Sequence, residues 1–324
     1  MPLLNPSESR VLLELAVERG FALLAVNADS HAAVTDCLEA ARHCDAPIIL
    51  EASLWQLTGH SYGHGDPILG LARYLADLTA LSESDRYRSV PILFHTDHIK
   101  GPDTLRILSA AIRGVPYRAS TVSVDSSELS EEENIQLICR LCEIADGAEV
   151  PLSLEMEAGI DAGVTDLAAA DRLLGAVEAR HPNRLALWAP GVGTQHGLSM
   201  RRDAFSPAAV EQHQRRASEI CGRPIGIALH GSSGLSESDL RAGVAAGVVK
   251  VNWSSESLLI RSRTAQEYYA THACELEKTH PKWKSAAMDN GVQSFVSTRY
   301  VPAVIHRIQT LGGEGQAAEW HDRH

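Results

Sequence analysis

The 324-residue sequence contains no run of about 18 apolar residues, the minimum length for a helix that crosses a bilayer. Its first ten residues, MPLLNPSESR, lack the basic segment and apolar core that mark a secretory signal. Internal repeats and low-complexity segments are also missing. We therefore expect a cytoplasmic protein without membrane association.

Positive charge is scarce in this chain. The 29 Lys and Arg residues are outnumbered by 41 Asp and Glu residues, which gives a formal net charge of −12. An excess of negative charge argues against a nucleic-acid partner or an anionic membrane surface. A small anionic substrate held in a local pocket remains compatible with this charge.

Cysteine is sparse and scattered, which argues against a disulfide framework and fits reduced thiols in the cytoplasm. Cys139 and Cys142 form a C-x-x-C pair inside NIQLICRLCEIA, a segment with helical periodicity. A spacing of three residues places both thiols on one helix face. We expect them to be buried apolar residues, and the alternative is a redox or metal-binding pair.

Apolar, strand-like segments alternate with helical patterns along most of the chain. These segments are apolar on both faces, as expected for parallel strands covered by helices. The eight predicted strands cover residues 21–27, 47–53, 90–97, 120–125, 150–157, 184–190, 224–230 and 248–253. This alternation predicts an α/β fold, a (β/α)8 TIM barrel in a single domain over residues 1–324. Residues from about 256 to 324 are expected to form extra C-terminal helices packed on the barrel, with packing against a partner subunit as the alternative.

The clearest unit of this pattern covers residues 224–253. A strand ends at His230, and the glycine-containing segment GSSG then turns the chain. Ser236 and Asp239 have the spacing of a capping box, which predicts a helix that runs to about Ala246. Gly247 then ends the helix before the next strand begins.

Three histidines lie at the carboxyl ends of predicted strands. His98 ends PILFHTDH, His196 lies in LALWAPGVGTQHG, and His230 ends PIGIALH. The carboxyl ends of barrel strands meet at one rim, where active sites of this fold lie. Neutral imidazole is a good zinc ligand, and three histidines leave one coordination position open. The pattern is typical of a catalytic rather than a structural metal site.

A carboxylate directly precedes the first of these histidines. Asp97 beside a metal ligand is suited to move a proton on a metal-bound substrate. Taken alone, the pair also fits an ordinary loop aspartate and a core-edge histidine. His95 is expected to support the strand rather than to bind the metal.

Glycines and small hydroxyl residues follow several predicted strands. GTQHG (193–197), HGSSG (230–234) and NWSS (252–255) offer backbone N–H groups and hydroxyls that suit a phosphate oxyanion. The alternative is a set of ordinary turns between strand and helix. In LEMEAG (154–159), Glu155 and Glu157 share one face of a strand. We expect one of them to approach the metal and the other to accept a hydrogen bond from a metal-binding histidine.

These motifs resemble the class II, metal-dependent fructose-bisphosphate aldolase family over residues 20–256. FHTDH, VSVDSSELSEEENI, LEMEAG, GTQHG, HGSSG and KVNWSSE occur in the family's order. The resemblance implies zinc held by His98, His196 and His230, and Asp97 as the proton carrier at the cleaved bond. It implies that Glu157 contacts the metal in alternative arrangements.

The resemblance also implies a substrate site and an activity. Five positions match family residues that hold the substrate phosphate and its ketone end: Gly197, Gly231, Ser233, Asn252 and Ser255. Family members cleave a ketose bisphosphate to dihydroxyacetone phosphate and an aldehyde, and zinc acts as the Lewis acid that stabilises the enediolate. Many members are dimers, and some use a monovalent cation near the phosphate. We therefore expect a phosphorylated ketose substrate and a homodimer or higher homo-oligomer.

The chain departs from the family pattern at three places. The loop after LEMEAG reads IDAGVTD (160–166), which puts Thr165 where the family has a proton-shuttling glutamate. Asp166 is our predicted replacement, with Asp161 or a different proton step as the alternatives. LSMRRD (198–203) replaces the aromatic residue and the lysine that often follow the histidine matched by His196, and Arg201 or Arg202 is the candidate source of that positive charge. The tail lacks a clear equivalent of the basic residue that some members use for a second phosphate.

Three other functions fit parts of this pattern. A metal-dependent isomerase or lyase would use the same enediolate without an aldehyde pocket. A non-catalytic metabolite-binding relative would explain the missing loop glutamate, although it would have no need for Asp97. Lys250, on the last predicted strand, would form a Schiff base with a ketone in a metal-independent aldolase.

Overall fold

Eight parallel strands form a closed barrel in the computed structural model, which describes residues 3–114, 117–125, 129–158, 163–198 and 205–323. Each strand pairs with its neighbours in chain order, and β1 closes the sheet by pairing with β8. The strands are β1 (Leu23–Val26), β2 (Ile48–Ala52), β3 (Ile92–Ile99), β4 (Thr121–Val124), β5 (Leu154–Ala158), β6 (Leu185–Pro190), β7 (Gly226–Leu229) and β8 (Val248–Trp253). The predicted (β/α)8 barrel is therefore confirmed.

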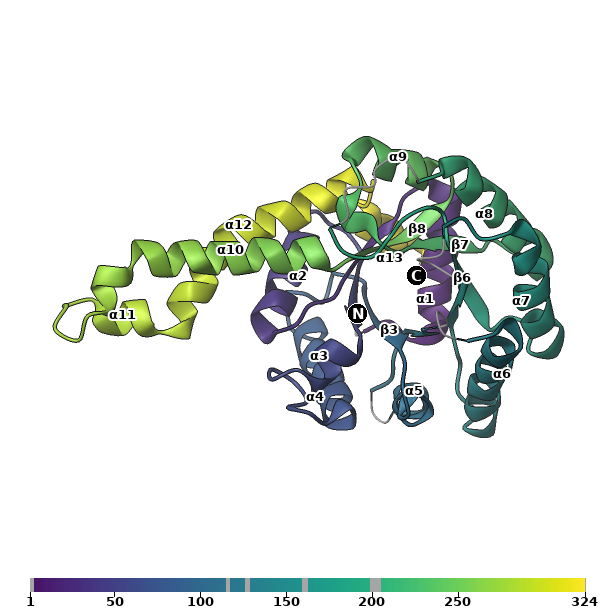
Figure 1. The fold of residues 1–324 in the computed structure, drawn as a ribbon, viewed down its shortest axis with the longest axis horizontal. Helices are drawn as coiled ribbons and strands as arrows, with labels where there is room; N and C mark the ends of the chain where they lie inside the picture. Colours follow the sequence, from purple (N-terminus) through teal and green to yellow (C-terminus); the bar gives the residue numbers. More distant parts are fainter. Residues whose placement is uncertain (1–2, 115–116, 126–128, 159–162, 199–204, 324) are drawn as a thin grey trace.

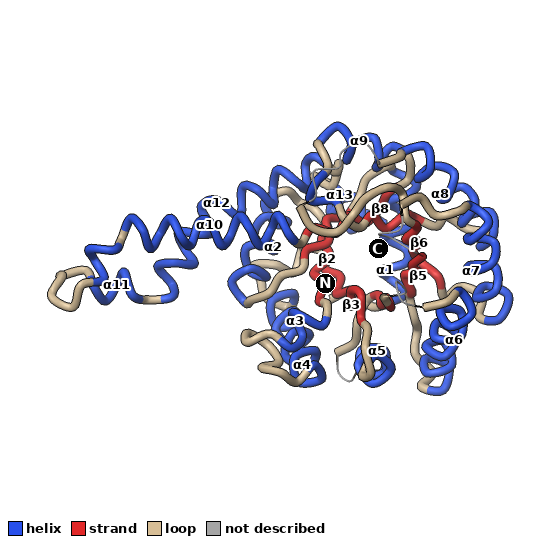
Figure 2. Tube along the Cα trace, in the orientation of Figure 1, coloured by secondary structure: helices blue, strands red, loops and turns tan. Residues whose placement is uncertain are grey.

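Helices surround the ring of strands (Figures 1 and 2). The helices associated with β1 to β8 and the N-terminal helix are α1 (Pro6–Arg19), α2 (His31–His43), α3 (Leu54–Thr58), α4 (Pro67–Ser82), α5 (Thr104–Arg113), α6 (Glu131–Gly147), α7 (Leu167–Arg180), α8 (Pro207–Cys221), η2 (Ser232–Gly234) and α9 (Glu237–Ala245). The C-terminal helices are α10 (Ser255–Thr271), η3 (Ala273–Leu276), α11 (Trp283–Ala287), α12 (Asp289–Thr310) and α13 (Gln316–Arg323).

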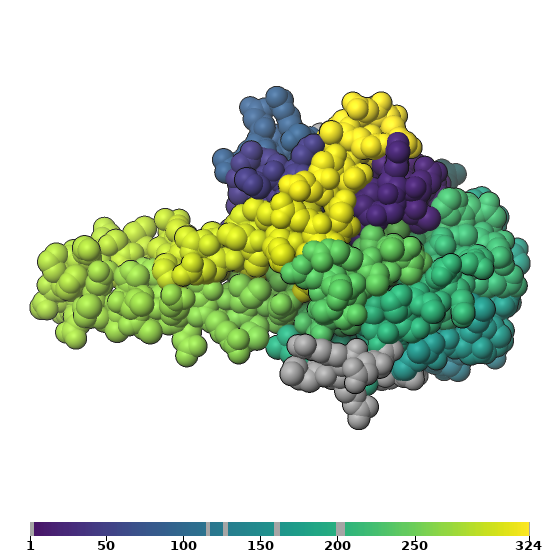
Figure 3. Space-filling view, turned by 90° about the horizontal axis from the view of Figure 1, so that it is seen from above, coloured from purple at the N-terminus to yellow at the C-terminus, as the bar shows by residue number. Residues whose placement is uncertain are grey.

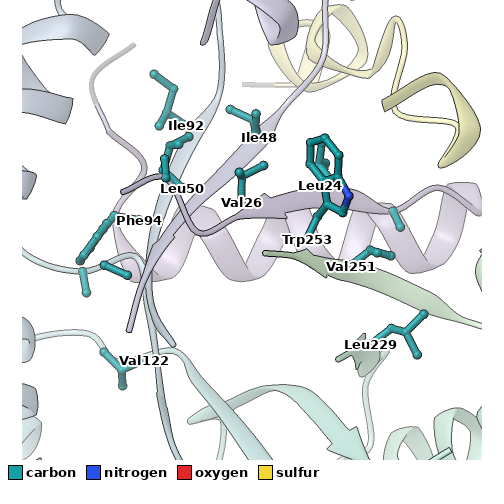
Figure 4. Close-up of a cluster of buried hydrophobic side chains, with 14 of the residues drawn as sticks. Leu24, Val26, Ile48, Leu50, Ile92, Phe94, Val122, Leu229, Val251 and Trp253 are labelled. Carbon is teal, nitrogen blue, oxygen red and sulfur yellow. The ribbon is translucent and has the colours of Figure 1, made fainter. Parts of the chain in front are cut away.

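Alternating side chains along the strands build two hydrophobic layers. Leu24 and Val26 face the surrounding helices, in the cluster drawn in Figure 4. Leu23 and Ala25 belong instead to a second cluster inside the barrel, together with residues of α1 such as Leu12. Because α1 packs into this interior, the barrel is filled at one end and the polar site occupies the other.

Local signals in the sequence are reproduced closely. Ser236 and Asp239 form the predicted capping box of α9, and β8 begins and ends at the predicted residues. Cys139 and Cys142 are both buried on α6 and carry free thiols, as predicted for apolar core residues.

The C-terminal helices form an arm beside the barrel. Helices α10 and α12 pack against each other and extend well away from the strands, with α11 at the far end (Figures 1 and 3). The proximal part of α12 contacts α2 and α9, and Trp320 of α13 is fully buried. The extension therefore packs on the barrel only in part. Within the described residues, no helix combines the length and apolarity needed to span a membrane.

Candidate active site

The three histidines converge at the carboxyl ends of β3, β6 and β7. Nε2 of His98 lies 3.2 Å from Nε2 of His196 and 2.6 Å from Nδ1 of His230. One ring nitrogen from each residue falls within 4.8 Å of the other two. Zinc–nitrogen bonds of about 2.1 Å in a tetrahedron place ligand nitrogens roughly 3.4 Å apart. The His98–His196 distance is close to this value, and the His98–His230 distance is shorter.

Two buried carboxylates fix the orientation of these rings. Oε2 of Glu157 lies 3.1 Å from Nδ1 of His98, and Oε1 of Glu155 lies 2.8 Å from Nε2 of His230. Carboxylates in this position fix the tautomer of a metal-binding histidine and raise its basicity. Nε2 of His98 and Nδ1 of His230 are thereby left to face the centre of the cluster.

Asp97 and His98 are neighbours in one strand, yet both line the same pocket. The pairing of β3 with β4 shifts register between Thr96 and Ile99, and His98 has a left-handed φ of 50°. A bulge of this kind re-aims one side chain of a strand. The irregularity therefore brings the carboxylate and the imidazole to the same side.

Two amides hold the carboxylate of Asp97. Nδ2 of Asn27 donates to one oxygen at 2.9 Å, and Nδ2 of Asn252 donates to the other at 3.0 Å. Burial alone would raise the pKa of Asp97, but nearby His98 and Lys250 hold it well below its usual value. The side chain is thus an oriented, ionised carboxylate beside the histidine cluster.

A buried network of charges lies next to Asp97. Nζ of Lys250 is 2.9 Å from Glu155 and 3.3 Å from Glu51, and it donates to Oδ1 of Asn252 at 2.7 Å. Burial by itself would lower the pKa of Lys250, but Glu155, Glu51 and Asp97 raise it above its usual value. A protonated amine is not nucleophilic, so this environment disfavours a Schiff base at Lys250.

Glu51 and His95 face the barrel interior. Each lies two residues after a member of the inner hydrophobic cluster, Ile49 on β2 and Leu93 on β3, and residues two apart on a strand share a face. Burial raises the pKa of Glu51 to about 8, and Asp97 acts in the same direction while Lys250 opposes it. Burial and Lys250 lower the pKa of His95 to about 3, and Thr121 lies 2.7 Å from its Nδ1. His95 therefore stays neutral inside the barrel, away from the three converging histidines.

A cavity of about 410 Å³ opens above the histidine cluster. Its lining includes Asp97, His98, His196 and Glu157, and also every residue predicted to hold the substrate. Those residues are Gly197, Gly231, Ser233, Asn252 and Ser255. The barrel rim thus brings Asp97, two of the three histidines and the predicted phosphate positions into one pocket.

The turns after β7 and β8 pack closely against neighbouring backbone and against each other. Gly231 has φ 66°, and a Cβ at this position would lie 2.5 Å from the backbone oxygen of Gln195. The hydroxyl of Ser232 donates to the carbonyl of Asn252, and the hydroxyl of Ser233 accepts from the backbone N–H of Glu256. These contacts tie the two turns together at the N-terminus of α10.

The sequence model of the family described as "Fructose-bisphosphate aldolase class-II" matches residues 7–314. The chain belongs to this family. The fructose-bisphosphate aldolase of Schizosaccharomyces pombe is 26% identical over 297 residues, which cover 79% of each chain. The D-tagatose-1,6-bisphosphate aldolase subunit GatY of Klebsiella oxytoca is 26% identical and covers 89% of this chain and 95% of that protein.

Solved structures show the same fold. The crystal structure of the fructose-bisphosphate aldolase of Campylobacter jejuni superposes with a TM-score of 0.82 at 20% identity, covering 97% of this chain and 96% of that one. The YdjI aldolase of Escherichia coli gives a TM-score of 0.70 at 16% identity and covers 95% and 98% of the two chains. As a class II aldolase family member, the protein is an enzyme of the lyase class, and its family depends on a metal ion.

In this aldolase, Thr165 joins the ends of two strands. Its hydroxyl donates to the carbonyl of Ala158 at 2.8 Å and accepts from the N–H of Gly191 at 2.8 Å. Asp166 caps α7 by accepting from the N–H of Ala168, and its side chain is 73% exposed. Asp166 is not among the described residues that line the pocket, so its catalytic role stays a prediction.

Several residues of the aldolase pocket were not identified from the sequence. Asn27 is the last residue of a predicted strand, and this position was the available signal for its contact with Asp97. Glu51, Trp55 and Lys100 carried no local signal, because their roles depend on neighbours from other strands. Three candidates of the sequence analysis lie outside the described residues: Asp161, Arg201 and Arg202.

Proposed function

We propose that this chain is a zinc-dependent class II aldolase. It cleaves or forms the carbon–carbon bond next to the ketone of a phosphorylated ketose, and dihydroxyacetone phosphate or a close relative is one fragment. The observation that carries this proposal is the convergence of His98, His196 and His230 beside Asp97, next to a cavity that Asp97, His98 and His196 line. The glycine and serine turns around the same pocket support a phosphorylated substrate.

His98, His196 and His230 would hold the metal ion. One ring nitrogen of each histidine lies within 4.8 Å of the other two, and their carboxylate partners leave Nε2 of His98 and Nδ1 of His230 facing inward. When bound, zinc supplies a Lewis acid that stabilises negative charge on an enediolate. Glu157 is assigned to orienting His98, and direct contact with the metal is the second arrangement open to it.

The substrate phosphate and ketone end would lie against the turns after β6, β7 and β8. Gly197, Gly231 and Ser233 offer backbone and hydroxyl donors to the phosphate, while Asn252 and Ser255 position the ketone end. The positive end of the α10 dipole adds attraction for an anion. A monovalent cation near the phosphate is part of the same proposal.

Asp97 would move the hydroxyl proton. In the cleavage direction the hydroxyl next to the breaking bond gives its proton to Asp97, and the aldehyde leaves. The electron pair of the broken bond stays on the ketone fragment, which then takes up a proton at carbon. Asn27 and Asn252 hold the carboxylate in one orientation for this transfer. Asp166 is our candidate for the proton that returns to carbon.

The test is release of dihydroxyacetone phosphate from fructose 1,6-bisphosphate, measured with added zinc and again after chelation. We expect release that the chelator abolishes and that zinc restores. Zinc binding without release from any ketose phosphate would overturn the aldolase proposal and favour an isomerase or lyase acting through the same enediolate.

We further infer a cytoplasmic homodimer or higher homo-oligomer built from one domain over residues 1–324. The arm formed by α10, α11 and α12 provides surface away from the barrel for such an assembly. Light scattering of the full chain tests this, and a monomeric mass at micromolar concentration would contradict it.

A further inference from the structure

Trp55 is an exposed indole at the active-site pocket. Its side chain lines the cavity and is 85% exposed, whereas Trp188, Trp253 and Trp320 are at most 1% exposed. Burying a side chain of this size contributes about 2 kcal/mol or more, so a fully exposed indole forgoes that stabilisation. An aromatic face left open at a binding pocket is available to a ligand.

A tightly built segment holds this indole in place. Trp55 is the second residue of α3, whose first turn is fixed by a capping box between Ser53 and Gln56. Gly63 and Gly70 approach Leu57 so closely that an added Cβ would meet its backbone oxygen at 1.9 and 1.8 Å. The segment that carries Trp55 is therefore part of a packed structure rather than the tip of a free loop.

The indole of Trp55 lies across the barrel from the proposed phosphate site, which the turns after β6, β7 and β8 form. In the closed strand order, β2, β3 and β4 lie opposite β6, β7 and β8. Trp55 follows β2, Lys100 follows β3 and Asp125 follows β4, and all three line the pocket. A ketose with its phosphate end on the β6–β8 side would extend its other end toward these three residues.

The charge on this side disfavours a second phosphate. Asp97, Asp125 and Glu157 are the acidic residues that line the pocket, and Lys100 is the one lysine or arginine among its described lining residues. Lys100 pairs with Asp125 at 3.2 Å, so its charge is already compensated. Hydroxyl groups can bond to both members of such a pair, and carbon-bound hydrogens of a sugar chain pack on an aromatic face.

We propose that the aldehyde half of the substrate is a polyhydroxylated chain without a terminal phosphate, seated on the indole of Trp55. This inference rests on the proposed aldolase function. In the synthetic direction, the carbon of dihydroxyacetone phosphate that has lost a proton bonds to the aldehyde carbon, and the aldehyde oxygen takes up a proton. Trp55 contributes contact with the rest of the aldehyde chain and so sets specificity.

The experiment has two separate measurements. Exchange of the carbon-bound proton of dihydroxyacetone phosphate with solvent needs no aldehyde, so it tests the aldolase chemistry alone. Condensation is then compared with erythrose, erythrose 4-phosphate and butanal as acceptors. We expect chelator-sensitive exchange, and a kcat/KM for erythrose at least about tenfold above those for both other aldehydes.

Variants link this preference to the indole. Trp55→Ala should lower kcat/KM for erythrose about tenfold through KM, while proton exchange is unchanged, and Trp55→Phe should retain most of the activity. Leu69→Ala, at a 48% exposed position on the neighbouring helix α4, is the matched control and should change neither quantity.

Three results would overturn the inference while the aldolase proposal stands on the exchange measurement. These are a preference for erythrose 4-phosphate, a preference for butanal, or an equal response of erythrose and butanal to Trp55→Ala. Loss of exchange itself would overturn the aldolase proposal.

Discussion

Nζ of Lys250 lies 2.9 Å from a carboxylate oxygen of Glu155, and both side chains are fully inaccessible to solvent. The other oxygen of Glu155 binds His230, so one buried carboxylate links the ammonium group to the histidine cluster. This arrangement makes Glu155 a test of how the barrel interior supports the site.

Glu155→Gln should both destabilise the fold and weaken metal binding. It leaves the Lys250 charge without its nearest partner, which typically costs about 3–5 kcal/mol in a buried pair. Loss of a carboxylate behind a metal-binding histidine typically lowers metal affinity about 10–100-fold. Urea unfolding and zinc titration measure the two effects. Glu143→Gln, which breaks an exposed pair with Arg140, is the control and should cost about 1 kcal/mol or less.

His98→Ala should abolish tight zinc binding. The other two histidines cannot by themselves complete a site with three protein ligands. Metal content after dialysis measures the result, and His43→Ala, an exposed residue in the last turn of α2, is the control that should keep one zinc per chain. An unchanged metal content in His98→Ala would refute the ligand assignment.

Glu51 should make the metal-free protein less stable as the pH rises. Its pKa is about 8 in the fold against 4.5 for an ordinary glutamate, so the folded protein binds a proton that the unfolded chain releases. The contribution of Glu51 to the free energy of unfolding is therefore fully present below its unfolded pKa, and between the two pKa values it falls by about 1.4 kcal/mol for each rise of one pH unit. Glu51→Gln has no such proton, so its stability relative to wild type should rise from about pH 5 to about pH 8. Urea unfolding in chelator checks this, and a difference that does not vary with pH would contradict it.

Asp97→Asn and Asp166→Asn should both lower kcat without unfolding the protein. Loss of a general acid or base typically lowers kcat about 10²–10⁴-fold, and we expect a loss of this order for Asp97. Asn caps a helix as well as Asp does, so Asp166→Asn should keep the stability of wild type while kcat falls. An unchanged kcat in a stable Asp166→Asn protein would refute the catalytic role predicted from the sequence.

Borohydride should trap no adduct with substrate at Lys250. The carboxylate of Glu155 holds the amine of Lys250 in its protonated form, so the amine is not available to attack a ketone. Mass spectrometry after reduction is the measurement, and a modified Lys250 peptide would show that the metal-independent mechanism operates.

The barrel and the histidine cluster were predictable because both follow from local pattern. The strands are apolar on both faces, and His98, His196 and His230 each follow one, so closure of the barrel brings them to one rim. To predict that these three rings lie close together, only the positions of the strand ends were needed, and not the exact register of the sheet.

The roles of Glu51, Lys250 and Asn27 were not predictable, because each depends on which residue faces it across the barrel interior. That relationship is set by the shear of the closed sheet and by bulges in β3 and β8, which have no signature in one sequence. The projecting arm was missed for a similar reason, since helical periodicity does not specify where a helix packs.

The bulge in β3 makes Asp97 and His98 move together. Asp97 and His98 are joined by one peptide unit, whereas His196 and His230 arrive on separate strands. When the barrel flexes, the two later histidines can shift relative to His98, but the carboxylate and the first ligand move as one body. The distance between Asp97 and His98, the proposed base and first metal ligand, would therefore change little, while His196 and His230 take up motions of the surrounding helices.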